Sequence, residues 1–337
     1  MSKVGELVLA GVKCQTYNDE EFARVRAFFH IGNDFAIDSF SFSRLKPGGG
    51  KGGDPMTRTD DEKFFVKQMN PGDHKVLVDP TFAKELADRV TDLDNPSIIG
   101  PIIAHVSNED TNKNYIVMIN CLRHQGKYFK QYDLKGCADD KLLLHNGVRV
   151  PAVHKRIWSV GIHCGMGGEA RKVYKQGKLE ALYEPHLPAT EAQKETICAA
   201  IEKDCDWLKS RNLMDYSLIV GVVDKGDNEE YDVIDVRTDD SLYAGKPLES
   251  VDADGKTHIL YLGIIDFLQK WTPAKTAAKV IKSLERNKAT IKPEPYAERF
   301  VEHFEHVLLA VDGDLDAQKE KRDNRKLGHR CYPLVKR

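Results

Sequence analysis

Two short stretches carry the strongest signal in this sequence: Met214-Asp215-Tyr216-Ser217-Leu218 and, further along, Ile264-Ile265-Asp266. Asp215 comes directly before an apolar run that predicts a buried strand, and Asp266 directly follows another. Placed together, they would be two carboxylates at the rim of one cleft. Phosphoryl transfer from ATP needs such a pair, one carboxylate to orient or deprotonate the attacking hydroxyl and one to hold Mg²⁺. Strand-terminal aspartates also commonly cap turns, so the spacing alone leaves both interpretations open.

A glycine-rich segment precedes a strand that carries a lysine. Residues 46–54 read Lys-Pro-Gly-Gly-Gly-Lys-Gly-Gly-Asp, and Gly50, Gly52 and Gly53 would let backbone N–H groups approach phosphate oxygens. Lys67 lies in an apolar run, where a charge without an anionic partner is costly. Phosphates would provide that partner, and an acidic residue on the next helix would hold the lysine in their absence. The alternative is a surface loop followed by an edge strand. The segment is not a Walker loop, because the required Gly-Lys-Ser/Thr is missing.

Residues 272–286 have the pattern of a basic amphipathic helix. Lys275, Lys279 and Lys282 recur along one side, and aliphatic residues lie mainly on the other. Residues 267–293 hold seven Lys/Arg against one acid, whereas the formal net charge of the whole chain is −2. Such a segment can lie on anionic lipid, although an ordinary solvated helix is the alternative. The overall charge gives no reason to expect a nucleic-acid partner.

The remaining patterns predict a small sheet lobe followed by a larger mixed lobe. Thr190 and Gln193 form a capping box at the start of the clearest helix. The predicted helices are 20–31, 80–92, 191–210, 272–286 and 296–310. The predicted strands are 64–69, 102–106, 115–119, 128–134, 217–223, 231–236 and 259–265.

The seven cysteines fit no zinc pattern, and reduced intracellular thiols are the simplest interpretation. The start of the chain lacks a charged residue cluster followed by a long apolar run, so no signal peptide is predicted. The apolar runs are too short to span a bilayer. We therefore expect a cytoplasmic protein, which could still touch a membrane from outside.

Several segments in a shared order resemble the phosphatidylinositol phosphate kinase family. Met214–Leu218 is similar to the family's most specific signature, and Tyr132-Asp-Leu-Lys-Gly-Cys137 resembles its Asp-Leu-Lys-Gly-Ser motif. Residues 261–269 resemble the metal-binding strand and the start of the activation segment. Residues 295–300 resemble the closing helix. The resemblance covers roughly residues 20–310.

The resemblance implies an α+β, two-lobed lipid kinase fold, distantly related to protein kinases, with antiparallel sheets in both lobes. The expected N-terminal lobe is 1–122, the catalytic lobe 123–316 with an activation segment at 266–294, and the basic tail 317–337. The tail is expected to be disordered. Members of the family often dimerise through the small lobe, so a homodimer is a further expectation.

The resemblance also assigns roles to individual residues. Asp215, Asp266 and Lys67 would be catalytic, with Asp266 holding Mg²⁺. ATP would contact Lys67, the loop glycines Gly50, Gly52 and Gly53, and the hinge residues Ile119, Asn120 and Leu122. The substrate, a phosphatidylinositol monophosphate in an anionic membrane on its cytoplasmic face, would contact Lys135, Lys141, Lys275, Ala278 and Lys279.

Some positions depart from the family's pattern. Pro55 lacks an N–H where an aromatic strand usually follows the glycine loop, so that strand could be shortened or frayed. Asp73 stands where the family often has Glu, which leaves open whether Asp73 or Glu85 steadies Lys67. Cys137 replaces the motif serine. Lys141 replaces an arginine, which would lose the fork geometry that guanidinium offers a phosphate.

The sequence is compatible with three functions. The leading one is a kinase that makes phosphatidylinositol 4,5-bisphosphate by attack of the 5-hydroxyl of the 4-phosphate. Ala278 instead favours the 4-hydroxyl of the 5-phosphate, because 4-kinases of the family carry Ala there and 5-kinases carry Glu. A catalytically weak phosphoinositide-binding scaffold is the second candidate. A kinase of soluble small molecules is the third, and the basic helix argues against it.

Overall fold

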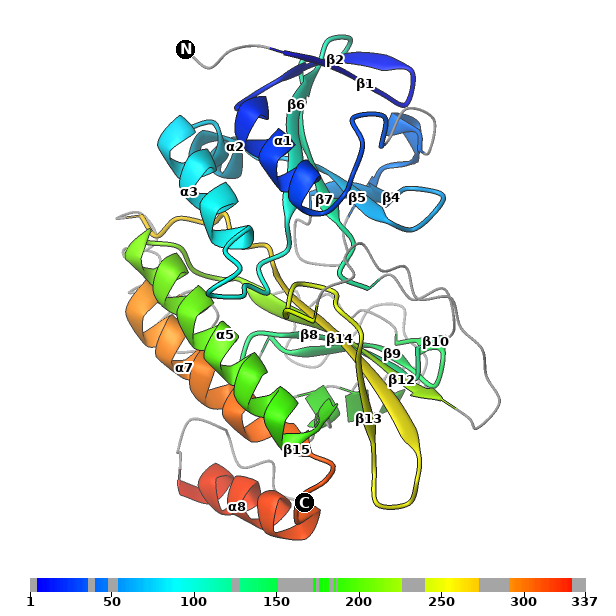
Figure 1. The fold of residues 1–337 in the computed structure, drawn as a ribbon, viewed down its shortest axis with the longest axis vertical. Helices are drawn as coiled ribbons and strands as arrows, with labels where there is room; N and C mark the ends of the chain where they lie inside the picture. The colour runs from blue at the N-terminus through cyan, green and yellow to red at the C-terminus, as the bar shows by residue number, and fades with distance from the viewer. Residues whose placement is uncertain are drawn as a thin grey trace. The chain divides into compact units, whose positions relative to one another are not determined.

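The computed structural model describes residues 5–35, 40–47, 54–122, 128–137, 139–150, 172–173, 176–177, 179–181, 185, 187–225, 240–272 and 291–328. The chain divides into two compact units, whose elements are labelled in Figure 1. The first unit consists of residues 1–126, 231–246 and 263–270, and the second of residues 127–230, 247–262 and 271–337. Two pieces from the second half of the sequence thus belong to the first unit, which the sequence did not indicate.

The first unit contains a seven-stranded antiparallel sheet in the order β1-β2-β6-β7-β5-β4-β3. Its central strands are buried and rich in β-branched residues, which favour a pleated surface. The β1–β2 hairpin was not predicted, whereas β5, β6 and β7 match predicted strands. The strands are β1 Glu6–Leu9, β2 Val12–Thr16, β3 Lys46–Pro47, β4 Pro55–Arg58, β5 Phe64–Gln68, β6 Ile102–Asn108 and β7 Asn114–Ile119.

Three α-helices and one 3₁₀ turn complete the described part of this unit. They are α1 Asp19–Phe28, η1 Phe42–Arg44, α2 Pro71–Leu77 and α3 Pro80–Val90. Helix α1 packs against β6 and α3. Its Arg26 is 2% exposed and is satisfied by Asp19 and by the Ile103 carbonyl, as a buried charge must be. Helices α1 and α3 were predicted, and α2 was not.

The second unit contains a six-stranded sheet in the order β10-β9-β8-β12-β14-β13. Strands β8, β12 and β14 match predicted strands, while β9, β10 and β13 were missed. The predicted strand 231–236 lies outside the described residues. The bounds are β8 Lys130–Leu134, β9 Lys141–His145, β10 Val148–Arg149, β12 Ser217–Lys225, β13 Leu248–Val251 and β14 Thr257–Ile265.

Two long helices, α5 Glu191–Ser210 and α7 Pro293–Val307, pack side by side in the second unit (Figure 1). The predicted capping box of α5 is present, with Thr190 and Gln193 bonded reciprocally. The predicted helix 296–310 was wrong at its end. Leu308 leaves the helical region, and β15 Leu308–Ala310 pairs in parallel with β11 Leu187–Ala189.

The basic tail was expected to be disordered, and its described part instead forms helix α8 Leu315–Gly328. Asp314 explains the start of this helix, because its carboxylate accepts hydrogen bonds from the N–H groups of Asp316 and Ala317. Among the described residues, no helix is both long and apolar enough to cross a bilayer.

The five cysteines in the described ranges form no disulfide: Cys14, Cys121, Cys137, Cys198 and Cys205. Cys205 is fully buried in the core, while Cys198 is half-buried. Burial raises the pKa of the Cys14 thiol and of the Cys198 thiol to about 11. These thiols are therefore packed, protonated side chains rather than reactive ones.

Candidate functional site

Lys67 and Asp266, two residues singled out by sequence, form an ion pair in the first unit. Lys67 lies on β5, with a side chain that is 13% exposed, and its Nζ donates to Asp266 Oδ1 at 2.6 Å. Asp266 directly follows β14, whose end is held in this unit by the Gly100 N–H bond to the Ile264 carbonyl at 2.8 Å. The Gly100 backbone thus fixes the end of β14, from which the loop that carries Asp266 begins.

Two further carboxylates surround the Lys67 ammonium. Asp54 Oδ2 lies 3.8 Å from Lys67 Nζ, and Asp73 on α2 attracts the same charge. The Asn70 side-chain amide bridges these acids, donating to Asp54 at 3.1 Å and to Asp73 at 3.0 Å. Its oxygen caps α2 by accepting from the Gly72 and Asp73 N–H groups.

The electrostatics of the cluster follow from these positions. Burial alone would lower the pKa of Lys67, but Asp266, Asp73 and Asp54 outweigh it and raise that pKa. Burial raises the pKa of Asp73 despite the opposing effect of Lys67. Asp73 on the short helix α2 is thus an acid from the following helix that acts on Lys67. With all groups ionised, three carboxylates and one ammonium leave an excess of negative charge.

This cluster fits the donor chemistry of Mg²⁺, which takes hard oxygen ligands. Within the described ranges, no three acidic, histidine or cysteine side chains are arranged to hold a metal ion by themselves. Mg²⁺ at phosphate sites typically has only one or two carboxylate ligands, with phosphate and water completing the shell. Asp266 and its neighbours can therefore contribute to such a site without forming a closed cage.

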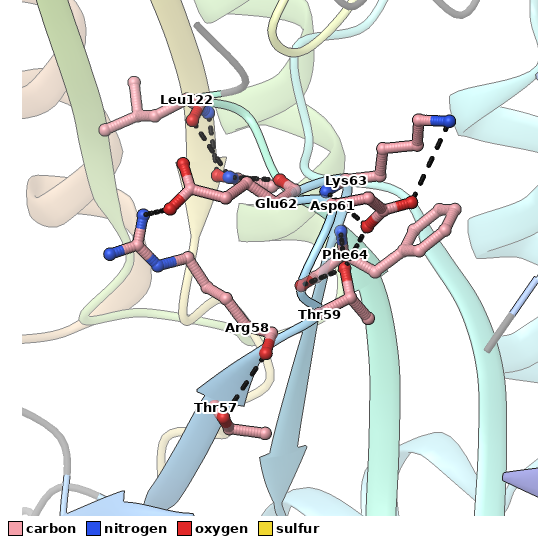
Figure 2. Close-up of polar contacts among 9 residues, drawn as sticks. Thr57, Arg58, Thr59, Asp61, Glu62, Lys63, Phe64 and Leu122 are labelled. Carbon is pink, nitrogen blue, oxygen red and sulfur yellow. Dashed lines mark hydrogen bonds and ion pairs between the residues drawn. The ribbon is translucent and has the colours of Figure 1, made fainter. Parts of the chain in front are cut away.

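The predicted hinge, residues 119–122, is tied to the turn between β4 and β5. Asn120 is 1% exposed, and its N–H donates to the Lys63 carbonyl at 2.8 Å. Its side-chain amide donates to the Glu62 carbonyl at 2.7 Å and the Leu122 carbonyl at 2.9 Å. The Leu122 N–H returns a bond to Asn120 Oδ1 at 2.9 Å. Figure 2 shows Leu122 beside this turn and the contacts that stabilise it.

Ile119 is the last residue of β7 and is 2% exposed. Beyond it, Cys121 packs against Gly263 of the strand that leads to Asp266. A Cβ added at Gly263 would lie 2.5 Å from Cys121 Sγ, so no larger residue fits without a shift. The hinge and the strand that ends before Asp266 are therefore in direct contact within the first unit.

The second unit contains another lysine–aspartate pair from predicted site residues. Lys135 Nζ donates to Asp215 Oδ1 at 2.7 Å and to the Asp215 carbonyl at 2.6 Å. The sheet explains this contact: Leu134 of β8 pairs with Leu218 of the antiparallel strand β12. A residue just after β8 and a residue just before β12 therefore reach the same edge of the sheet.

The residue after Asp215 anchors its loop. Tyr216 is fully buried, and its ring lies 4.7 Å from the Tyr296 ring and 4.9 Å from the Phe300 ring, centroid to centroid. The Tyr296 hydroxyl donates to the Tyr216 carbonyl. Aromatic residues of α7 therefore fix the backbone that carries Asp215.

Both predicted catalytic aspartates have left-handed backbone conformations, with φ of 67° at Asp215 and 58° at Asp266. Aspartate tolerates this region better than most residues, yet it remains uncommon. Lys141, at the start of β9, contacts Asp133: its Nζ lies 2.8 Å from Asp133 Oδ2, and the charge of Lys135 also acts on it. This carboxylate outweighs burial and raises the pKa of Lys141.

Several predicted site residues lie outside the described residues. They are Gly50, Gly52 and Gly53 of the glycine loop, and Lys275, Ala278 and Lys279 of the predicted basic helix. Asp54 and Asn70 were not predicted as site residues. The Asn70-Pro71 pair is a helix-start signal that would have located α2, whereas nothing local to Asp54 indicates its contact with Lys67.

Mixed helices and antiparallel sheets in both units place the chain in the predicted α+β class. The family model described as Phosphatidylinositol-4-phosphate 5-Kinase matches residues 41–249 and 240–307. The chain therefore belongs to the phosphatidylinositol phosphate kinase family, as the motifs predicted.

Curated relatives within this family carry different substrate names. A 1-phosphatidylinositol 3-phosphate 5-kinase of Saccharomyces cerevisiae is 21% identical, over 90% of this chain and 12% of the relative. A phosphatidylinositol 5-phosphate 4-kinase type-2 gamma of Danio rerio is 23% identical, over 87% of this chain and 76% of the relative. Phosphatidylinositol 4-phosphate 5-kinase 3 of Arabidopsis thaliana is 23% identical, over 84% of this chain and 44% of the relative. The chain thus spans a small part of the yeast relative and less than half of the plant one.

Proposed function

We propose that this chain transfers the γ-phosphate of ATP to the inositol ring of a phosphatidylinositol monophosphate. The observation that carries this proposal is the pair of lysine–aspartate contacts, Lys67–Asp266 and Lys135–Asp215, formed by motif residues far apart in sequence. Phosphoryl transfer requires little covalent chemistry from the protein. It depends on holding phosphates, compensating their charge and orienting the attacking hydroxyl.

In this proposal the first unit holds the nucleotide. Lys67 exchanges part of its contact with Asp266 for phosphate oxygens, and Asp266 contributes to holding Mg²⁺. When bound, the metal would neutralise charge on the phosphates. The loop residues Gly50, Gly52 and Gly53 would cover the phosphates, and Ile119–Leu122 would contact adenine. The Leu122 N–H already bonds to Asn120, so adenine recognition here would rely on other backbone groups of the hinge.

The second unit would hold the acceptor hydroxyl. Asp215 accepts or orients the hydroxyl proton as the oxygen attacks phosphorus. Lys135 contacts Asp215, and in the complex with substrate it would stabilise the phosphate carried by the inositol ring. Lys141 is the second proposed contact to that phosphate, and it would have to exchange its contact with Asp133 for the substrate.

The lipid surface is the proposed place of reaction. Lys275 and Lys279 lie in the segment with seven Lys/Arg and one acid, a charge pattern that favours anionic headgroups. Ala278 would contribute to the choice of substrate. We propose a cytoplasmic protein bound peripherally to the inner face of membranes. Dimerisation remains a proposal that rests on the family alone.

The attacked hydroxyl is proposed as the 5-hydroxyl of the 4-phosphate, with the 4-hydroxyl of the 5-phosphate as the alternative favoured by Ala278. The three relatives are named for three different reactions. The experiment offers vesicles with the 3-, 4- or 5-monophosphate and γ-labelled ATP, and identifies the labelled ring position. Label at the 5-position from the 4-phosphate supports the main proposal. Vesicle binding without transfer to any isomer would instead support the phosphoinositide-binding scaffold. The strand β4, which follows the glycine loop, forms despite Pro55, so this strand gives no argument for a catalytically weak protein.

A further inference from the structure

Asp140 is a deeply buried carboxylate in the turn between β8 and β9, and the chemistry above does not use it. Its side chain is 1% exposed. Oδ1 accepts hydrogen bonds from the Lys135 N–H at 2.5 Å and the Cys137 N–H at 3.2 Å. The Asp140 N–H donates in turn to the Cys137 carbonyl at 3.0 Å. One side chain therefore closes the whole turn.

The turn that Asp140 closes begins at Lys135, the residue whose Nζ contacts Asp215. A further constraint acts on the same backbone at Gly136, which has φ of 67°. A Cβ added there would lie 3.0 Å from the His303 Cβ and 3.4 Å from the Arg299 carbonyl of α7. The Lys135 backbone is thus set by Asp140 on one side and by close packing against α7 on the other.

We infer that Asp140 is a positioning residue, which acts through the Lys135 backbone to hold the Lys135 ammonium on Asp215. This inference rests on the proposed function for its consequence in catalysis. The contact itself, from Asp140 Oδ1 to Lys135 N and from Lys135 Nζ to Asp215, lies entirely within the second unit.

The surroundings of Asp140 are unfavourable for a charged carboxylate and therefore reduce the stability of the folded protein. Its Oδ2 makes no hydrogen bond within the described residues, and His303 Nε2 lies 3.7 Å away. Asp133 disfavours the charged form, and Arg299 favours it. Burial raises the pKa of Asp140 to about 7 although two N–H groups favour its ionised form. A buried group with an incompletely satisfied oxygen is costly, which fits a role beyond closing a turn.

A double-mutant cycle separates this role from a purely structural one. Asp140→Ala and Lys135→Ala are each expected to lower kcat about tenfold or more, while KM for ATP stays within about twofold. In a Lys135→Ala background, Asp140→Ala is expected to have little further effect, because it acts through the lysine. Additive losses, or a matching rise in the KM for ATP, would overturn the inference.

Two variants control for damage to the fold. Asp140→Asn keeps an oxygen that can accept both N–H bonds and is expected to retain most of the wild-type kcat. Asp252→Ala removes a similar aspartate turn from the same unit, where Oδ1 accepts from the Asp254 and Lys256 N–H groups. It is expected to leave kcat unchanged. A loss of kcat in Asp140→Asn equal to that in Asp140→Ala would contradict positioning by hydrogen bonds.

A readout without turnover distinguishes failure of this inference from failure of the proposed function. The rate at which an amine-reactive reagent labels Lys135, followed by mass spectrometry, reports how firmly its Nζ is held. We expect faster labelling in Asp140→Ala and wild-type labelling in Asp140→Asn and Asp252→Ala. Unchanged labelling in Asp140→Ala would overturn the inference. A wild-type protein inactive toward all lipids would overturn the proposed function, and the labelling rates would still decide the role of Asp140.

Discussion

At the scale of single residues, the environment of Lys67 explains why its partners matter. The ammonium is shared by Asp266, Asp54 and Asp73, which come from three separate segments of the chain. Their combined charge exceeds that of the lysine, so a further cation would be stabilised nearby. Of the two carboxylates in contact with Lys67 Nζ, Asp266 is the closer, at 2.6 Å against 3.8 Å for Asp54.

Asp266→Asn should lower the rate of phosphate transfer by about a hundredfold or more, because the proposed metal ligand loses its charge. The Mg²⁺ concentration needed for half-maximal rate should rise in the residual activity. Rates measured across a Mg²⁺ titration check both effects. Asp60→Asn, which removes an exposed carboxylate paired with Arg44 at 2.8 Å, is the matched control. An undiminished rate in Asp266→Asn would refute the metal role.

Asp140→Asn should change stability in a pH-dependent way. The folded-state pKa of Asp140 is raised from 3.8 to about 7, so the neutral form is favoured in the folded protein. That stabilising contribution is present below about pH 4 and is lost as the pH rises through 7. The neutral asparagine avoids this loss, so its advantage in free energy of unfolding should grow between pH 5 and pH 8. Urea denaturation at both values measures it; a difference that shrinks with pH would contradict the burial argument.

At the scale of elements, the β13–β14 hairpin is held to β12 by an imidazole between two acids. His258 Nδ1 lies 2.7 Å from Asp224 Oδ1, and His258 Nε2 lies 3.0 Å from Asp252 Oδ2. Lys256 Nζ contacts the other oxygen of Asp224 at 2.6 Å. Only the doubly protonated ring can donate to both carboxylates, and hydrogen bonding to Asp224 is the largest cause of the raised pKa of His258.

His258→Asn should therefore destabilise the protein more at low pH than at high pH. The contribution of His258 is fully present below pH 6.5 and is lost as the pH rises through its raised folded-state pKa. We expect a loss of about 1–2 kcal/mol at pH 6 and a smaller loss at pH 9. Denaturant unfolding at the two pH values tests this, with the exposed His30→Asn as control. An equal loss at both values would show that the charge of the imidazole is not involved.

Thr190→Ala removes the cap of α5 and should reduce the free energy of unfolding by about 1 kcal/mol. Thr190 Oγ1 accepts from the Gln193 N–H at 3.2 Å, and the Gln193 side chain accepts from the Thr190 N–H at 2.9 Å. Thr196→Ala is the control, because Thr196 is an exposed threonine inside the same helix. Equal denaturation midpoints for Thr190→Ala and the wild type would contradict a stabilising cap.

Elements with a strong local pattern could be predicted from the sequence. Helix α5 has a capping box and a regular apolar stripe, and strands β5 and β7 are short apolar runs. The β1–β2 hairpin was missed because its turn has Ala10 at φ of 50° before Gly11, instead of the usual Asn-Gly or Asp-Gly. Strand β15 was mistaken for helix because its apolar residues continue the helical spacing, and only the distant β11 pairs with it.

The residues of the candidate site could be predicted only where a motif marks them. Lys67, Asp215 and Asp266 lie in recognisable segments, and the structure brings Lys67 to Asp266. The contact of Asp54 with Lys67 and the turn closed by Asp140 depend on side-chain geometry that no periodicity encodes. The sequence left open whether Asp73 or Glu85 steadies Lys67, and the unpredicted helix α2 places Asp73 where its charge acts on Lys67.

At the scale of the whole molecule, the proposed reaction at a lipid surface predicts salt-sensitive vesicle binding. Reversing Lys275, Lys279 and Lys282 to Glu should weaken binding to anionic vesicles about tenfold or more at low salt. The difference should shrink as ionic strength rises, because surface charges are screened. Co-sedimentation with vesicles over a salt series measures it.

A matched triple reversal controls for the change in total charge. Lys13, Lys84 and Lys321 are exposed lysines spread over the described residues. Their replacement by Glu changes the net charge equally and should affect vesicle binding much less. Equal weakening in both triple variants would mean that overall charge, rather than the segment 267–293, determines binding.

The most direct test of the proposed phosphate transfer is the initial rate at which label moves from γ-labelled ATP to phosphatidylinositol monophosphate in vesicles. It is measured for the wild type and for Asp215→Asn, which keeps the size of the side chain and its contact to Lys135 through an oxygen. The proposed function predicts labelled bisphosphate from the wild type and a rate lower by about a hundredfold or more in the variant. Transfer at the same rate by both proteins, or by neither with any monophosphate, would contradict it.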